Sequence, residues 1–300
     1  MRDSKKAELC SQLLKEEKEK RSLIWGDKDE KYIQKIVREW IDDEENYDGT
    51  VKFLERRTNL KNKLVLDFGA GYGTALLYCL KKGYKAIGID ISKDSANFFR
   101  ERVKKLKYKK LWISRYVLSE GENLPFKPES FDVVISNQVI EHVKDPKKCV
   151  LEIFRVLKEG GILYLRAPDY STSFYEPHYR IFWTPFFNTR TKTSHFFTKM
   201  YLKILNRPVA GLKYLNFITK KELISALKDA GFSQITDLNK EIIFDDRERK
   251  LKELLKRFGL NIQNGSGEKF IKALNLIYEI IRQIRMMGRE ENQIHLLAMK

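Results

Sequence analysis

The first sixty residues carry a pattern of apolar positions that is typical of a helix. Five apolar side chains recur at the i, i+3, i+4, i+7 and i+8 spacing that places them on one face, namely Ile33, Ile36, Val37, Trp40 and Ile41. A stripe of this kind must pack against another element. We therefore interpret residues 1–60 as a helical N-terminal extension rather than as a separate domain.

From position 63 onward, short apolar runs alternate with longer helical patterns. The expected strands are 64–68, 85–91, 114–119, 131–136 and 162–167. The expected helices are 74–82, a lysine-rich stretch after the second strand, and 146–157, which ends at the Gly160-Gly161 pair. Strands that alternate with helices of this length form β-α-β units, so the pattern predicts an α/β fold with a parallel sheet.

The composition narrows the class of protein. Apolar residues make up 42% of the 300 positions and charged residues 33%, which is too apolar for a disordered chain and too charged for a membrane channel. No apolar run approaches the roughly 20 residues that span a bilayer, and residues 1–20 lack the apolar core of a signal peptide. A soluble, cytoplasmic protein is expected. Its three cysteines, Cys10, Cys79 and Cys149, are too scattered for a disulfide framework or a zinc site.

The formal net charge of +17 raises the question of a nucleic-acid partner. The basic excess lies after position 60, with net charges of +8 in residues 61–170 and +10 in residues 171–300. Much of it is lysine on helix faces, as in 104–110, a pattern typical of solvated surface. A dedicated nucleic-acid groove is therefore not favoured, although it stays open as an alternative.

The first strand-to-helix turn contains a candidate ligand loop, DFGAGYG at residues 67–73. Glycines let the backbone turn tightly and approach a ligand, and the following helix presents free N–H groups. The Gly-x-Gly-x-Gly spacing differs from that of dinucleotide binders, and Asp67 would repel a pyrophosphate but suits an amino group. Asp90, at the end of the second strand, is placed to accept both hydroxyls of a ribose. An amino group and a ribose with no phosphate between them describe S-adenosylmethionine.

With these motifs in place, the chain resembles the class I S-adenosylmethionine-dependent methyltransferases. DFGAGYG is similar to the family's first motif, GIDIS to its second, and SEGENLPFKPESFDVVISNQVIEHVKDPKKCVLEIFRVLKEGGILYLRAPDY to the third-to-fifth-strand region of the type 11 group. The resemblance covers residues 63–169, 219–232 and 293–300. It implies a Rossmann-like fold with a seven-stranded, mostly parallel sheet and an antiparallel last strand, in a methyltransferase domain that spans residues 61–300.

The resemblance also implies which residues bind the cofactor. They are Asp67 for the methionine amino group, Gly69 and Gly71 for the methionine moiety, Gly73 in the same loop, Asp90 for the ribose, Ile91, Glu120 and Gly121 for the adenine, and Asn137 for the methyl sulfonium. The alternative is that Asp67 only caps the next helix and that Asp90 only ends a strand.

The pair Glu141-His142 follows the fourth strand. In ubiquinone-type O-methyltransferases a Glu-x-x-Glu-His stretch at this place is associated with a divalent metal, but Gln138 stands at the first position here, so a hard cation would lose a charged oxygen ligand. No metal site is expected. His142 could act as general base toward an acceptor hydroxyl, because its unperturbed pKa lies near neutral. The alternative is a histidine satisfied by backbone hydrogen bonds.

An aromatic insertion at residues 170–215 follows the fifth strand, at the side of the sheet where class I folds bind ligands. We expect it to form a lid over the acceptor. The candidate catalytic residues in it are Tyr175 and His178, and the candidate acceptor-binding residues are Glu176, Tyr179 and Trp183. The alternative is that the aromatic side chains form a second hydrophobic cluster under a long loop.

Two further segments predict amphipathic helices. Within residues 192–207, lysines flank an apolar stripe formed by Phe196, Phe197, Met200, Tyr201 and Ile204. This helix could make a peripheral contact with an anionic membrane surface, but packing as part of the lid is favoured. A helical insertion at residues 246–288 carries two more such helices, which either extend the core or form a dimer surface. The oligomeric state is left open.

These observations favour a methyltransferase that acts on a small-molecule or a lipid- or sugar-linked acceptor, with oxygen as the expected methylated atom. One alternative is an RNA methyltransferase that uses the basic C-terminal half. Against it, residues 136–139 lack the Asn/Asp-Pro-Pro-Tyr/Phe pattern that stacks on a base and binds its exocyclic amine. Another alternative is a non-catalytic S-adenosylmethionine-binding module. Its signature would be lost glycines or acids, and none is lost.

Overall fold

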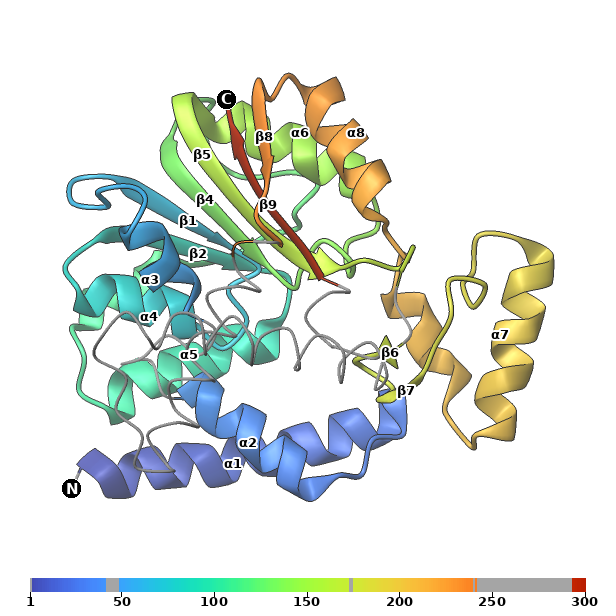
Figure 1. The fold of residues 1–300 in the computed structure, drawn as a ribbon. Helices are drawn as coiled ribbons and strands as arrows, with labels where there is room; N and C mark the ends of the chain where they lie inside the picture. The colour runs from blue at the N-terminus through green and yellow to red at the C-terminus, as the bar shows by residue number, and fades with distance from the viewer. Residues whose placement is uncertain (1, 42–48, 173–174, 240, 242–292) are drawn as a thin grey trace, which may run out of the picture.

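The computed structural model describes residues 2–41, 49–172, 175–239, 241 and 293–300 (Figure 1). The predicted helical insertion at 246–288 lies outside the described residues. The helices are α1 (Arg2–Trp25), α2 (Glu30–Ile41), α3 (Thr50–Glu55), α4 (Thr74–Lys81), α5 (Lys93–Lys105), α6 (Pro146–Val156), α7 (Lys192–Ile204) and α8 (Lys220–Ala230), with the 3-10 turns η1 (Lys110–Arg115) and η2 (Val209–Tyr214). The strands are β1 (Leu64–Phe68), β2 (Lys85–Asp90), β3 (Tyr116–Leu118), β4 (Phe131–Asn137), β5 (Leu157–Pro168), β6 (Tyr175–Glu176), β7 (Ile181–Phe182), β8 (Gln234–Asp237) and β9 (Gln293–Met299).

Seven strands form one twisted sheet in the order β3-β2-β1-β4-β5-β9-β8. Neighbours from β3 to β5 pair in parallel, whereas β9 runs antiparallel to both β5 and β8. The expected Rossmann-like sheet with a reversed last strand is therefore confirmed. Because β1 lies between β2 and β4, the carboxyl ends of these three strands meet at one edge of the sheet, where ligands bind in open α/β sheets.

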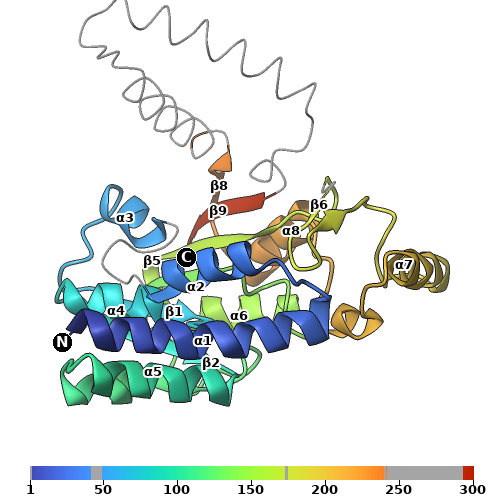
Figure 2. The same ribbon diagram turned by 90° about the horizontal axis from the view of Figure 1, so that it is seen from below.

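Helices cover both faces of the sheet (Figures 1 and 2). On one face, α6 and α8 bury Ile153 and Leu223 against strand residues such as Leu66 and Leu165. On the other face, α3, α4 and α5 bury apolar side chains against Val65, Val133 and Ile135. The central strands are thus apolar on both sides, which explains why they appear in the sequence as continuous apolar runs rather than as alternating patterns.

One boundary differs from the sequence expectation. The helix predicted to continue to the Gly160-Gly161 pair ends at Val156, and β5 begins at Leu157. Leu157 pairs with Phe131 of β4, and the register then shifts before Val133 pairs with Ile162. The strand therefore contains an irregularity at the glycines, which Gly160 accommodates with a φ of 68°.

The N-terminal helices pack on the outer side of α5. Ile33, Val37 and Ile41 of the expected apolar stripe of α2 lie in a cluster with residues of α1 and α5, among them Leu9, Leu13 and Phe98. Arg102 of α5 is wholly buried and donates hydrogen bonds to the carbonyl oxygens of Trp40 and Ile41 at the end of α2. The extension is therefore attached to the sheet domain by both apolar packing and buried hydrogen bonds.

The insertion after β5 builds a small unit beside the sheet. It contains the β6–β7 hairpin, α7 and η2, and Figures 1 and 2 both place α7 away from the sheet. Its aromatic side chains gather in a hydrophobic cluster of their own, which includes Tyr179, Trp183 and Phe217 together with Trp25 from the end of α1. Most of these aromatic side chains therefore lie in a second hydrophobic cluster, which is the alternative to an acceptor site that the sequence left open.

Part of the apolar stripe of α7 faces outward. Phe196 is 63% exposed and Ile204 is 72% exposed, whereas the buried side of the helix is formed by Ser194, Thr198 and Leu202. Tyr201 of the stripe stacks on Phe187 and Phe197 contacts Phe186, so only part of the stripe faces away from the described part of the chain. Among the described residues, no helix combines the length and the apolar character needed to cross a membrane.

Candidate functional site

Three of the predicted cofactor residues lie at the carboxyl edge of adjacent strands. Asp67 is near the end of β1, Asp90 ends β2 and Asn137 ends β4. Asp67 pairs in register with Gly88 of β2 and with Ile135 of β4, so all three polar residues stand within a short distance along the same edge. Asp67 is buried, and the N-cap of α4 is Gly73 with no side-chain cap, so Asp67 does not serve as the cap of that helix.

The glycine loop is held against the end of β2 by hydrogen bonds. The backbone N–H groups of Gly69 and Ala70 both donate to the carbonyl oxygen of Ile89, at 2.9 and 2.7 Å. One carboxylate oxygen of Asp90 accepts from Gly71 N at 2.9 Å, and the other accepts from Ser92 N at 2.8 Å. Because each carboxylate oxygen has two lone pairs, each retains capacity for one ribose hydroxyl.

Two glycines in this loop are required for different reasons. Gly69 has a φ of 79°, and a Cβ there would stand 2.2 Å from Val139 Cγ2. Gly71 has a φ of 50°, but a Cβ there would meet nothing within 4 Å. The first glycine therefore permits close packing, whereas the second borders open space in which a methionine chain could pass.

The predicted adenine residues lie on the neighbouring loops. Ile91 is 63% exposed, an unusual position for an isoleucine unless a flat apolar group covers it. The Glu120 carboxylate is also exposed and lies 3.3 Å from Lys144 Nζ. A Cβ at Gly121 would stand 2.5 Å from Phe68 Cζ, so this glycine also serves packing.

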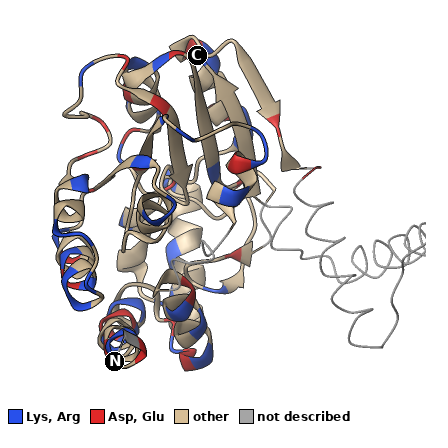
Figure 3. Cartoon of the chain, turned by 90° about the vertical axis from the view of Figure 1, so that its left-hand side faces the viewer, with Lys and Arg blue, Asp and Glu red and all other residues tan. Residues whose placement is uncertain are grey.

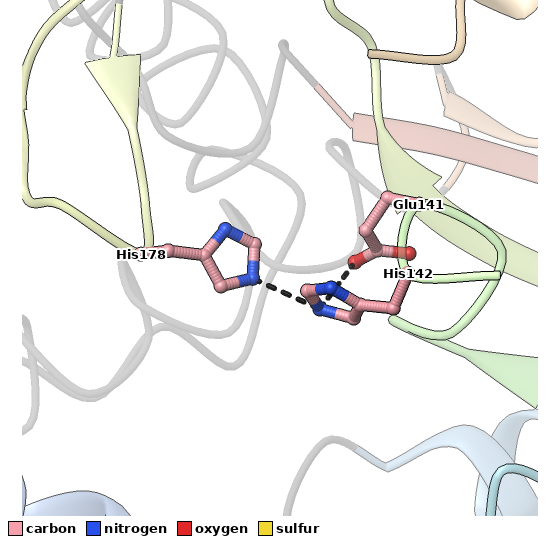
Figure 4. Close-up of side chains that lie close together, drawn as sticks. All are labelled: Glu141, His142 and His178. Carbon is pink, nitrogen blue, oxygen red and sulfur yellow. Dashed lines mark hydrogen bonds and ion pairs between the residues drawn. The ribbon is translucent and has the colours of Figure 1, made fainter. Parts of the chain in front are cut away.

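A second group of polar side chains joins the loop after β4 to the insertion (Figure 4). Glu141 and His142 come from the β4–α6 loop, and His178 comes from the connection between β6 and β7. The Nε2 atoms of His142 and His178 lie 3.1 Å apart, and Glu141 Oε1 lies 3.9 Å from His142 Nε2. The structure therefore brings the two predicted histidines together although 36 positions separate them.

Each ring is fixed through its other nitrogen. His142 Nδ1 lies 2.7 Å from the carbonyl oxygen of Tyr214, and His178 Nδ1 lies 2.7 Å from Oε1 of Glu176. Glu176 is fully buried and also accepts hydrogen bonds from Tyr170 Oη at 3.0 Å and from Tyr179 N at 2.6 Å. Glu176 thus orients His178 and does not itself face an open acceptor space.

Burial and neighbouring charges shift the pKa values in this cluster in opposite directions. Burial raises the pKa of Glu141 to about 7, against the attraction of His178. Burial, with the charge of His178, lowers the pKa of His142 to about 4. Burial also disfavours a charged His178, but the Glu176 carboxylate outweighs this effect and raises its pKa. Burial likewise opposes ionisation of Glu176, yet His178 and the hydrogen bonds together lower its pKa.

The other predicted acceptor residues lie elsewhere. Tyr179 and Trp183 are wholly buried within the aromatic cluster of the insertion, and Tyr179 Oη donates to the carbonyl of Pro208 at 2.9 Å. Tyr175 precedes Glu176 in β6, so its side chain lies on the opposite side of the strand from the histidines. None of these three side chains joins the Glu141–His142–His178 cluster.

Sequence reasoning missed Trp25 as a neighbour of this cluster. The centroid of its ring system lies 5.0 Å from that of His178, and it also contacts Tyr179 and Tyr214 edge-on. The end of α1 therefore forms part of the wall around the histidines. The only signal in the sequence is an isolated Trp directly before Gly26, which does not predict a contact so far along the chain.

Comparison with known proteins identifies the central part of the chain. Residues 66–165 match a family model described as a methyltransferase domain, of the type 11 group. The chain is 28% identical over 248 residues to the uncharacterized protein MJ1123 of Methanocaldococcus jannaschii, a match that covers 82% of this chain and 96% of that protein.

Two other matches cover about half of their counterparts. A ubiquinone biosynthesis O-methyltransferase of Methylococcus capsulatus is 29% identical over 125 residues, covering 42% of this chain and 52% of that enzyme. Among solved structures, phosphoethanolamine N-methyltransferase 2 of Haemonchus contortus, in complex with S-adenosyl-L-methionine, is 21% identical, with a TM-score of 0.47 and coverage of 83% of this chain and 51% of that one.

Proposed function

The chain belongs to the type 11 group of class I S-adenosylmethionine-dependent methyltransferases, and we propose that it transfers the methyl group to an oxygen of a small-molecule or a lipid- or sugar-linked acceptor. The observation that carries this proposal is the position of the Glu141–His142–His178 cluster. It begins four residues after Asn137, at the same carboxyl edge as the cofactor loop, and consists of groups that can bind an acceptor hydroxyl.

The cofactor half of the proposed site uses the predicted residues. Asp90 offers its remaining lone pairs to the ribose, and the open space beside Gly71 admits the methionine chain. Buried Asp67 would attract the amino group, and exposed Ile91 would be covered by the adenine. In this proposal Asn137 faces the methyl sulfonium.

In this proposal, the residues on the acceptor side of the site position the acceptor and accept its proton. Methyl transfer by direct displacement needs a nucleophile that is aligned with the methyl group and has given up its proton. With Nδ1 of each ring held by an acceptor, an acceptor O–H would meet the cluster at the Nε2 atoms of His142 and His178, which face each other across 3.1 Å. The surrounding Trp25 and the insertion would restrict water at this place.

The surface of the insertion favours a lipid-linked acceptor within this class. The outward stripe of α7 presents Phe196 and Ile204, and Lys199 and Lys203 lie on the same helix. Such a surface fits a membrane that carries anionic lipids. In contrast, Figure 3 shows Lys and Arg spread over several elements with Asp and Glu between them, which does not favour an RNA groove.

The test is methyl transfer from isotopically labelled S-adenosylmethionine to small-molecule extracts, lipid extracts and total RNA, with mass spectrometry of the labelled product. A labelled oxygen ester or ether is expected from the wild-type protein. His178→Ala should lower turnover while cofactor affinity stays within about threefold, and His195→Ala on α7 is the matched control. A product labelled only in RNA, or full activity in His178→Ala, would contradict the proposal.

A further inference from the structure

The two histidines of the cluster meet through atoms that repel each other when both rings are neutral. Nδ1 of His142 faces a carbonyl oxygen and Nδ1 of His178 faces a carboxylate oxygen, so both Nδ1 atoms are donors. In a neutral imidazole the remaining Nε2 then carries a lone pair. The lone pairs of the two Nε2 atoms therefore point toward one another across 3.1 Å. A positive species between them would turn this repulsion into attraction.

Glu141 adds an independent observation. Its side chain is fully buried, and neither carboxylate oxygen has a hydrogen-bond partner among the described residues. A buried carboxylate without partners is costly, so native structures normally pair it or place it on a metal. A proton shared between the two rings would remove the repulsion between the two Nε2 lone pairs. It would still leave both carboxylate oxygens of Glu141 without a hydrogen bond.

We propose that Glu141, His142 and His178 bind a divalent transition-metal ion of the Zn²⁺ class. Their ligand atoms all lie within 4.8 Å of one another (Figure 4). Two imidazole nitrogens bound to one zinc ion at about 2.0–2.1 Å in tetrahedral geometry stand about 3.3 Å apart, close to the 3.1 Å between the Nε2 atoms. Two imidazoles and one carboxylate favour a transition metal over Mg²⁺ or Ca²⁺, which prefer oxygen ligands. Three protein ligands leave at least one position open.

The surroundings already supply the groups that orient metal-binding histidines. Such histidines usually donate their other N–H to a carboxylate or a backbone carbonyl, which fixes the ring and strengthens the ligand. Here Glu176 accepts from His178, and the carbonyl of Tyr214 accepts from His142. Glu176 is itself held by Tyr170 and by the backbone of Tyr179.

This inference departs from the sequence expectation of no metal. That expectation considered only residues on the loop after β4, where Gln138 replaces a carboxylate. The side chain of Gln138 is directed to β9, since its Nε2 lies 2.5 Å from Oε1 of Gln293. The third ligand comes instead from the insertion, where spacing along the sequence could not reveal it.

A metal here would also deepen the proposed function. The open position could hold the acceptor oxygen, and the ion would lower the pKa of its hydroxyl, replacing the hydrogen bond to a free imidazole. This role rests on the methyl transfer proposed above, whereas metal binding itself can be measured on the protein alone.

The experiment is calorimetric titration of chelator-treated full-length protein with ZnCl₂ and, separately, MgCl₂. The wild type should bind one equivalent of Zn²⁺ and should bind Mg²⁺ much more weakly. Glu141→Gln and His178→Ala should each weaken Zn²⁺ binding by about 100-fold or more, while His195→Ala on α7 should match the wild type. S-adenosylmethionine affinity within about threefold of wild type shows that each variant is folded.

Equal Zn²⁺ affinity in the wild type, Glu141→Gln and His178→Ala would overturn the metal site. If a variant loses cofactor binding, the visible absorption of Co²⁺ bound to wild-type protein decides instead, because a His₂-carboxylate site and adventitious surface binding give different spectra. Methyl transfer by chelated protein that binds no metal would refute this inference and leave the proposed function intact. Metal binding by a protein that transfers no methyl group would support the metal site and contradict the proposed function.

Discussion

The Nδ1 atom of His178 lies 2.7 Å from Oε1 of buried Glu176, and this contact fixes which nitrogen of His178 faces the cluster. Glu176 is a positioning residue, because its carboxylate touches His178 and two other protein groups but no open space. Glu176→Ala should lower kcat by about tenfold or more through loss of ring orientation.

The same variant should change KM for the acceptor less than kcat and leave cofactor affinity within about threefold. Glu176→Asp, which keeps a carboxylate, should restore part of kcat. Steady-state kinetics on the purified variants measure both. A proportional loss of kcat and of cofactor binding would instead indicate a purely structural role for Glu176.

A second prediction concerns Asp90 and the cofactor. Its two carboxylate oxygens each accept one backbone N–H and can each accept a ribose hydroxyl. Asp90→Ala should weaken S-adenosylmethionine binding by about 1.5–3 kcal/mol, the range for hydrogen bonds to a charged group. Asp94→Ala, in the first turn of α5, is the control and should bind normally. Unchanged affinity in Asp90→Ala, measured by calorimetry, would remove the ribose assignment.

Local patterns predicted well the strands and the loop that carry the expected cofactor residues. The strand at 64–68 and the position of the glycine loop follow from the order of apolar, acidic and glycine residues within ten positions, and the structure has β1 at those residues. The same locality explains why β4 and its terminal Asn137 could be expected. The burial of a strand and the tight turn that follows it act within one β-α unit, so a single stretch of sequence is enough to predict them.

The acceptor half depends on contacts between distant segments. His142 and His178 were both candidates, but nothing in the sequence predicted that their Nε2 atoms would meet. Helical periodicity in α7 revealed an apolar stripe but not which side would be buried, and the structure buries Ser194, Thr198 and Leu202 most deeply while Phe196 and Ile204 of the stripe stay exposed. Tertiary packing decides such choices, because a helix can bury a narrow face of small residues as well as a wide apolar one.

A third prediction concerns the attachment of the N-terminal extension. Arg102 is wholly buried and donates to the carbonyls of Trp40, Ile41 and Tyr72. Arg102→Met keeps most of the volume but removes these hydrogen bonds, and although the Trp40 carbonyl keeps the Thr74 hydroxyl as donor, a buried carbonyl left unsatisfied costs about 1–3 kcal/mol. The free energy of unfolding should fall by at least about 2 kcal/mol in urea. Arg100→Met, on the same helix, should change it by less than about 0.5 kcal/mol.

The effect of Arg102 should reach the cofactor loop, because Tyr72 lies between Gly71 and Gly73 and its Oη lies 2.5 Å from Glu17 of α1. Reduced stability with S-adenosylmethionine affinity equal to wild type would show that the extension stabilises the fold without shaping the loop. Unchanged stability would refute the prediction altogether.

A fourth prediction concerns pH and Glu152 of α6. Its hydrogen bonds to Arg155 lower its pKa, with a further contribution from the backbone N–H of Leu124 and against the effect of burial. A depressed folded pKa stabilises the protein above the unfolded pKa, about 4.3 for Glu, and this stabilisation is lost as the pH falls through the folded value. Glu152→Gln should therefore destabilise by about 0.5–2 kcal/mol at pH 7 and by less at pH 3.

Urea unfolding of the wild type and of Glu152→Gln at several pH values measures this difference. Glu159→Gln is the control, since that carboxylate is largely exposed and lies 3.9 Å from Lys300 Nζ. A difference that stays constant from pH 7 to pH 3 would show that the amide disrupts packing rather than a charged hydrogen bond.

The last prediction is that α7 contacts membranes that carry anionic lipids. Phe196 and Ile204 are exposed on its outer side, and burying two such side chains in the interface contributes about 1.5–3 kcal/mol each at most. The protein should bind vesicles with anionic lipid more tightly than neutral ones, and added salt should weaken the binding because lysines contribute. Phe196→Ser combined with Ile204→Ser should reduce binding by at least about tenfold, whereas Leu23→Ser, at an equally exposed leucine of α1, should not. Vesicle co-sedimentation measures this, and equal binding by both variants, or no preference for anionic lipid, would assign the exposed stripe to some partner other than a membrane.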